Sequence, residues 1–169
     1  YDFGNGFTAA LGYEGEGAST KGLFTKESMD VFGGQVTYTG DSYGASVTYS
    51  DYESSTDTTY LALNAYYTPE SAGSIPSISA GYESATVTGG TDSSQWFVGL
   101  QWDEVGAGTL GAALGTYGHI ADGATEYYMY EAFYSYPMND GMTITPVVFI
   151  KETSGDDETG LMVKTSFSF

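Results

Sequence analysis

The stretch Gly160-Leu-Met-Val-Lys-Thr-Ser-Phe-Ser-Phe169 alternates along its whole length. In an extended strand, Leu161, Val163 and Phe167 fall on one side, and Lys164 falls on the other. In a soluble protein, such a terminal strand would leave an unpaired sheet edge that promotes aggregation. A closed β-barrel removes this edge, because its last strand pairs with its first. The stretch therefore predicts the closing strand of a barrel, with Phe7–Tyr13 as the candidate partner.

Composition also favours a β protein and excludes several functions. The 169 residues suggest a single domain, residues 1–169, and they include 24 Gly, 16 Tyr and no Cys. Without cysteine there is neither a disulfide framework nor a thiolate metal site. The formal net charge is -18 with only four basic residues, which argues against nucleic acid as a partner. The sequence contains no apolar run of about 18 residues, so it predicts no transmembrane helix.

Alternating segments recur along the chain, separated by Gly-, Asp- and Ser-rich breaks. We count about ten of them: 7–13, 32–38, 43–50, 60–67, 78–83, 96–102, 110–115, 127–136, 144–151 and 160–169. Period-2 patterning of this regularity predicts antiparallel strands joined as hairpins. One face of nearly every segment carries no charge, whereas the other holds small, polar and a few charged residues. We therefore expect an all-β fold, an antiparallel transmembrane β-barrel in the bacterial outer membrane.

The two faces predict two sets of residues. The polar face should line the pore, with Gln35, Asn64, Tyr66, Gln101, Glu131, Thr145, Lys151 and Lys164. The apolar face should contact outer-membrane lipid through an aromatic girdle, with Trp96, Trp102, Tyr128, Tyr136, Phe167 and Phe169. Aromatic residues also occur on the polar face, where two interpretations stay open: a stacking track for sugar rings, or simple filling of the lumen. This set comprises Tyr60, Tyr66, Phe97, Tyr127 and Phe133.

The connections alternate between long and short, as the outer loops and periplasmic turns of such barrels do. The exception is 68–76, which is long for a periplasmic turn. Acidic residues gather in the long connections, at Asp51, Glu53, Asp92, Asp122, Glu126, Asp156, Asp157 and Glu158. Three interpretations stay open: a mouth that attracts cations, ordinary solvated loops, or a surface that binds divalent cations between lipopolysaccharides.

Two charged positions on the polar face suggest an interaction across the lumen. Hairpin pairing predicts Glu131 beside Val147, and Val147 beside Lys164, which places the two charges about 10 Å apart. They would either create a transverse field or form an ion pair.

His119 is the one histidine, and it lies near Asp122 in a long connection. Omptin proteases, outer-membrane barrels of ten strands, use His and Asp at their outer rim, so an omptin-like hydrolase is an alternative function. A lone histidine is more typical of a surface loop, and the sequence has no motif of a serine hydrolase, zinc protease or phosphate loop. We therefore expect no enzyme, no catalytic residue, no metal and no cofactor.

Four stretches together resemble the C-terminal part of cyanobacterial outer-membrane porins related to the OprB carbohydrate-selective family: 95–103, 127–137, 139–146 and the Phe169 ending. The resemblance implies a barrel of roughly 16 strands, a homotrimer, and passage of carbohydrates and other small hydrophilic solutes. Because members usually carry an N-terminal S-layer-homology domain, this chain would be a C-terminal fragment or a shortened relative.

Taken together, the residues and the resemblance predict a porin for passive diffusion of small hydrophilic solutes and ions, with a mild cation preference from the acidic mouth. A structural or adhesive assembly is the other alternative. In that case the strands would pair between chains.

Overall fold

A computed structural model describes residues 1–16, 18–22, 24–25, 29–54, 56–71 and 74–168. The described residues form ten long strands, two short strands and one helix of four residues. The long strands are β2 (Phe7–Glu16), β3 (Met29–Thr39), β4 (Tyr43–Tyr52), β5 (Thr58–Tyr67), β6 (Ser77–Val87), β7 (Ser93–Val105), β8 (Gly108–Thr116), β10 (Tyr128–Asn139), β11 (Met142–Lys151) and β12 (Glu158–Phe167). The short elements are β1 (Asp2–Gly4), β9 (Ile120–Ala121) and α1 (Ala18–Lys21). Each of the ten predicted segments overlaps one long strand, which confirms the prediction of an all-β antiparallel fold.

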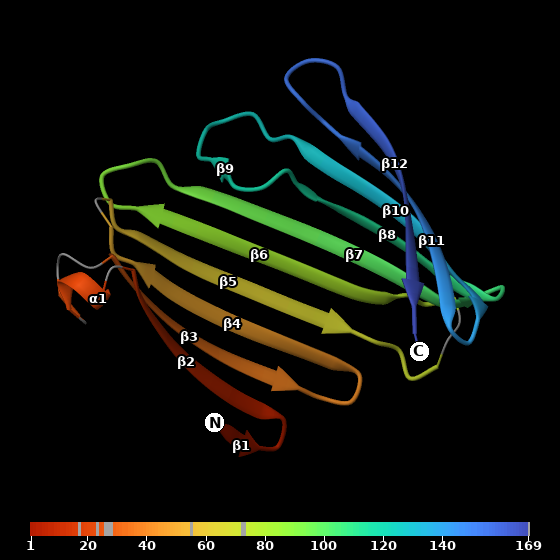
Figure 1. Ribbon diagram of the computed structural model, residues 1–169, viewed down its shortest axis with the longest axis horizontal. Coiled ribbons are helices and arrows are strands. Elements are labelled where there is room, and N and C mark those ends of the chain that lie inside the picture. Colours follow the sequence, from red (N-terminus) through yellow and green to blue (C-terminus); the bar gives the residue numbers. More distant parts are fainter. Residues whose placement is uncertain (17, 23, 26–28, 55, 72–73, 169) are drawn as a thin grey trace.

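The strands form one sheet in which nearly all neighbours in space are neighbours in sequence. The order runs from β1 to β8 and on through β10, β11 and β12, and every pairing is antiparallel. β9 lies off this path and pairs with the beginning of β7. Figure 1 shows a single curved layer, with the short β1 and β12 at the two edges. Among the described residues, no helix is long and apolar enough to cross a bilayer.

The sequence left open whether the last strand pairs with Phe7–Tyr13, and the described residues do not show this pairing. Within the described residues, no hydrogen-bonded ladder joins β12 to β1 or β2, so both edges of the sheet are free. The reason is geometric, because the strands curve through only part of a cylinder and leave the first and last strands apart (Figure 1).

Cross-strand register assigns each side chain to one of two faces. One row of aligned residues crosses eight strands: Ser46, Asn64, Gly81, Phe97, Gly115, Met129, Lys151 and Glu158. We call the face that carries this row the inner face. The neighbouring positions on each strand, such as Leu63 and Val98, belong to the outer face, because successive side chains point to opposite sides of a sheet.

The outer face is apolar and open to its surroundings. Leu11 is 93% exposed and Leu161 is 72% exposed, and the only buried hydrophobic residues of the described chain are Ala85 and Val147. A water-soluble domain of this size would bury a far larger apolar core. Because apolar side chains gain stability when removed from water, this face requires an apolar cover such as lipid.

The connections lie at two opposite ends of the sheet. One end, which we call the loop rim, carries 17–28, 53–57, 88–92, 117–127 and 152–157. The other, the turn rim, carries 5–6, 40–42, 68–76, 106–107 and 140–141. Long and short connections therefore alternate as predicted, and 68–76 is the exception. Two of the two-residue turns, 5–6 and 106–107, use left-handed backbone, as at Gly106 with φ 65°.

Candidate functional site

The inner face brings the predicted pore-lining residues onto one surface. Gln35, Asn64, Tyr66, Gln101, Glu131, Thr145, Lys151 and Lys164 all occupy inner-face positions in the observed register. Their neighbours on this face are mostly glycine, serine, threonine and alanine. Polar side chains hydrogen-bond along the wall, as the Gln35 side chain does by donating from Nε2 to Thr48 Oγ1 over 2.8 Å.

The predicted proximity of Glu131 and Lys164 is wrong. Glu131 pairs with Phe149, which pairs with Gly160, whereas Lys164 pairs with Thr145. Thr145 in turn donates a hydrogen bond to Ser135 Oγ at 3.1 Å. Because Ser135 is four residues from Glu131 on the same strand, the two charges are offset by about 13 Å along the strands. The Glu131 carboxylate and the Lys164 ammonium group therefore form no ion pair. They also do not face each other at one level of the sheet, so they do not create the expected transverse field.

All eight carboxylates of the predicted acidic mouth lie at the loop rim or in its connections: Asp51, Glu53, Asp92, Asp122, Glu126, Asp156, Asp157 and Glu158. Several also hold the rim together. Asp92 Oδ1 accepts a hydrogen bond from the Val87 amide at 3.0 Å, and Glu126 accepts one from the Tyr128 hydroxyl at 2.6 Å. Glu158 lies 3.4 Å from Lys151 Nζ, so this lysine is partly neutralised at the rim.

His119 belongs to a network that the sequence did not reveal. Its Nε2 lies 2.6 Å from Glu83 Oε1, and its Nδ1 lies 3.1 Å from Ser93 Oγ. Gln95 donates a further hydrogen bond to Glu83 Oε1 at 3.0 Å. The predicted neighbour Asp122 is instead held through its backbone amide, which donates to the Asp92 carbonyl at 2.8 Å. These contacts attach the connection 117–127 to the inner face at the loop rim.

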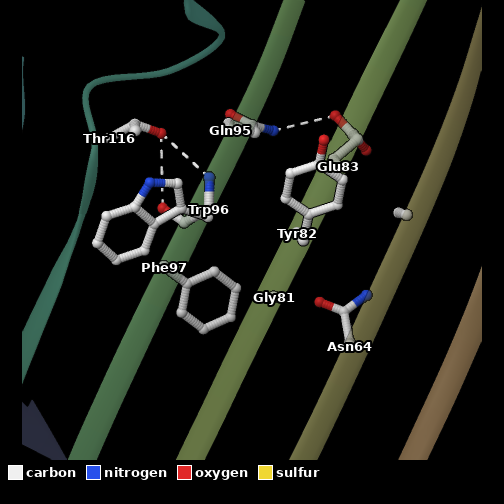
Figure 2. Close-up of a pocket in the computed structure, with 9 residues that line it drawn as sticks. Asn64, Gly81, Tyr82, Glu83, Gln95, Trp96, Phe97 and Thr116 are labelled. Carbon is white, nitrogen blue, oxygen red and sulfur yellow. Dashed lines mark hydrogen bonds between the residues drawn. The ribbon is translucent and has the colours of Figure 1, made fainter. Parts of the chain in front are cut away.

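A shallow basin of about 310 Å³ adjoins this network on the inner face. Its wall includes Asn64, Gly81, Glu83, Gln95 and Phe97. Figure 2 shows the Phe97 ring alongside Gly81 and the hydrogen bond from Gln95 to Glu83. Amide and carboxylate groups beside an aromatic ring give a surface that can contact a hydrated solute by hydrogen bonds and by its apolar parts.

Three polar residues of the inner face were not predicted as pore-lining: Glu83 and Gln95, which line this basin, and Asp103, which lies closer to the turn rim. Each stands at the end of an alternating segment and on its polar side, which was the signal available. All three occupy inner-face positions.

The predicted girdle residues lie on the outer face near the strand ends. The rings of Trp96 and Tyr128 are 5.9 Å apart on the side of the loop rim. Towards the turn rim, Trp102 donates from its indole nitrogen to the Ser74 carbonyl at 3.3 Å, and Tyr136 stacks beside Tyr134. Phe167 is 63% exposed at the same end. Phe169 lies outside the described residues.

This combination of a small, polar inner face and an exposed apolar outer face agrees with the comparison to known families. Residues 1–158 match the family model of the Gram-negative porins. The chain belongs to the Gram-negative porin family. Family membership places this porin in the bacterial outer membrane.

Solved porins have the same fold. The anion-selective porin from Comamonas acidovorans matches with a TM-score of 0.76 at 15% identity, over 98% of this chain and 56% of that one. A porin structure refined at 1.8 Å resolution also gives a TM-score of 0.76, at 18% identity, over 100% of this chain and 60% of that one. The chain therefore spans a little under two thirds of these porins. None of the curated proteins compared matches the sequence.

Proposed function

We propose that this porin forms part of a water-filled channel through which small hydrophilic solutes and ions diffuse passively. The observation that carries the proposal is the division of the sheet into two faces. The outer face exposes large apolar side chains, and the inner face holds mostly small and polar ones, with several aromatic rings among them. A curved sheet with an apolar exterior and a polar interior suits the wall of an aqueous channel across lipid.

A mild preference for cations is the second element of the proposal. The net charge is -18, and eight carboxylates lie at or near the loop rim. A concentration of one sign of charge at a pore entrance attracts counter-ions and repels co-ions. The porin from Comamonas acidovorans is described as anion-selective. It is similar to this chain in fold, and selectivity depends on charges that a fold does not determine.

Further roles extend the same proposal. We assign the inner-face residues named above to the pore wall and the outer-face aromatics to the lipid interface, in a single domain, residues 1–169, that forms part of a β-barrel. A homotrimer and a relation to the cyanobacterial carbohydrate-selective porins also belong to the proposal. They are supported by the sequence motifs at 95–103, 127–137 and 139–146. Diffusion needs no catalytic residue and no cofactor.

One observation favours the alternative of an assembly between chains. Both sheet edges are free among the described residues, and free edges can pair with other strands. Fibres with a cross-β repeat in detergent-free solution would support this alternative.

Planar-bilayer recording tests the channel proposal. The purified protein, inserted into a bilayer in KCl, should produce discrete and roughly ohmic current steps. Under a KCl gradient, the zero-current potential should have the sign of cation preference. Absence of current steps would contradict the channel, and clear anion preference would contradict the assigned selectivity.

A further inference from the structure

A second basin lies on the inner face, next to the one in Figure 2 and closer to the turn rim. Its volume is about 490 Å³. Its floor is made of small residues, Ser79, Gly99 and Ala113. Three of the aromatic residues that line it belong to the inner face: Tyr66, Phe97 and Phe133. The floor is tight, because a Cβ added at Gly99 would lie 2.8 Å from Ser79 Oγ.

The three rings share one arrangement. Each packs over a glycine of a neighbouring strand, with Tyr66 over Gly44, Phe97 over Gly81 and Phe133 over Gly111. A Cβ at any of these glycines would collide with the ring. The rings therefore lie against the wall. Phe97 remains 45% exposed and Tyr66 40% exposed, whereas Phe133 is half-buried.

The charge of the basin is negative. Asp103 lines it, and Oδ1 of Asp103 accepts hydrogen bonds from Gln101 Nε2 at 3.0 Å and Thr109 Oγ1 at 3.3 Å. Both donors are neutral, so they orient the carboxylate without cancelling its charge. Glu131 lies beside the floor, paired with Ala113. No lysine is among the residues that line the basin.

We propose that this basin is a binding site for organic ammonium cations, through which the channel retains and passes amines with apolar substituents. The inference rests on the proposed channel function and names a solute class for it. The faces of aromatic rings attract cations, and several rings around one site are a known mode of quaternary ammonium recognition. The Asp103 carboxylate adds attraction for the positive charge, and the ring surfaces cover the alkyl groups. A neutral sugar would gain nothing from the unbalanced negative charge.

Block of the channel by tetraethylammonium is the test. This ion should reduce the single-channel K⁺ current in a saturable manner. Phe97→Leu and Phe133→Leu should each raise the half-blocking concentration by about 2- to 5-fold, because each removes one ring face. Asp103→Asn, which keeps the size of the side chain, should also raise it.

Phe149→Leu is the matched control. Phe149 also packs over a glycine of the neighbouring strand, Gly160, but it does not line the basin. The tetraethylammonium concentration that halves the current of Phe149→Leu should equal that of the unmodified protein. If tetraethylammonium blocks Phe97→Leu, Phe149→Leu and the unmodified protein at the same concentration, the inference is overturned. It is also overturned if glucose reduces the current at the same concentration as tetraethylammonium does.

A measurement without current separates the two proposals. In detergent micelles, saturation-transfer NMR should detect tetraethylammonium protons on the unmodified protein, with a weaker signal for Phe97→Leu and for Asp103→Asn. KCl current without any tetraethylammonium signal or block would overturn the cation site and leave the channel standing. A tetraethylammonium signal that depends on Phe97 in a protein without KCl current would support the site and contradict the channel.

Discussion

His119 Nε2 lies 2.6 Å from Glu83 Oε1, although the two residues are 36 positions apart in sequence. Glu83 belongs to β6 and His119 to the connection that follows β8, so the contact passes over β7. The pairing of β9 with the beginning of β7 supports it, through Ser93 opposite Ala121 and Ser94 opposite Ile120. The connection 117–127 is therefore attached to the inner side of the loop rim.

Replacement of His119 by alanine should loosen this connection. The variant loses the contacts to Glu83 and Ser93. Each contact should stabilise the connection about as much as a hydrogen bond between partly exposed groups does. Hydrogen exchange of the Asp122 amide, which donates to the Asp92 carbonyl, should become about 2- to 10-fold faster. Mass spectrometry of peptides from 117–127 measures the change.

Asp122→Asn is the control for His119→Ala, because Asp122 lies in the same connection and is held through its backbone amide. Exchange in this control should match the unmodified protein. If His119→Ala and Asp122→Asn exchange alike, the His119–Glu83 contact does not hold the connection.

Gly81→Ala should destabilise the sheet, because the new Cβ would collide with the Phe97 ring and crowd Asn64. Overpacking of this kind costs about 1–3 kcal/mol. Gly12→Ala is the matched control, since a Cβ at Gly12, on β2, meets nothing within 4 Å. Urea unfolding in detergent micelles compares the two variants. Equal stability of both would show that the ring does not cover Gly81.

Neutralising part of the loop rim should weaken cation preference. Replacement of Asp122, Asp156 and Asp157 by asparagine removes three negative charges from two of the loop connections. The ratio of K⁺ to Cl⁻ permeability should fall towards one at 0.1 M salt, where charges act over about 10 Å. At 1 M salt, screening over about 3 Å should leave little difference between the variant and the unmodified protein. An unchanged ratio at low salt would assign selectivity to other groups.

Trp96 and Trp102 should both lie at the membrane interface, on opposite leaflets. They share the outer face of β7 and are six residues apart, which corresponds to about 20 Å along the strand. Single-tryptophan variants, Trp96→Phe and Trp102→Phe, isolate one fluorophore each. Lipids brominated near the headgroup should quench either tryptophan more than lipids brominated near the chain end. Stronger quenching from the chain end would place the residue in the bilayer centre instead.

Alternation allowed the strands and faces to be predicted from sequence, and it also explains what failed. A shift of the pairing by two residues leaves every side chain on its face, so the pattern determines the face but not the register. The sequence prediction paired Glu131 with Val147, whereas Glu131 pairs with Phe149 and the register changes again between Pro137 and Asn139. The proposed proximity of Glu131 and Lys164 depended on register, and it was wrong for that reason.

The elements that were missed are short or depend on distant contacts. β9 has only two residues, too few to show a period. The position of His119 depends on Glu83, and nothing local in 117–127 indicates that contact. The Asp103 position in the second basin likewise requires the pairing of β7 with its neighbours, because Thr109 on β8 orients the carboxylate.

Accessibility of single cysteines tests the central claim, that one face of the sheet meets water and the other meets lipid. The chain contains no cysteine, so each introduced thiol is the only one. Neighbouring residues give matched pairs from opposite faces: Asn64 with Leu63, Gln101 with Leu100, and Thr145 with Ile144. In lipid vesicles, a charged, membrane-impermeant methanethiosulfonate should modify the cysteines at Asn64, Gln101 and Thr145 rapidly, and those at Leu63, Leu100 and Ile144 slowly or not at all. Equal modification within each pair, or faster modification at the leucine and isoleucine positions, would contradict the account.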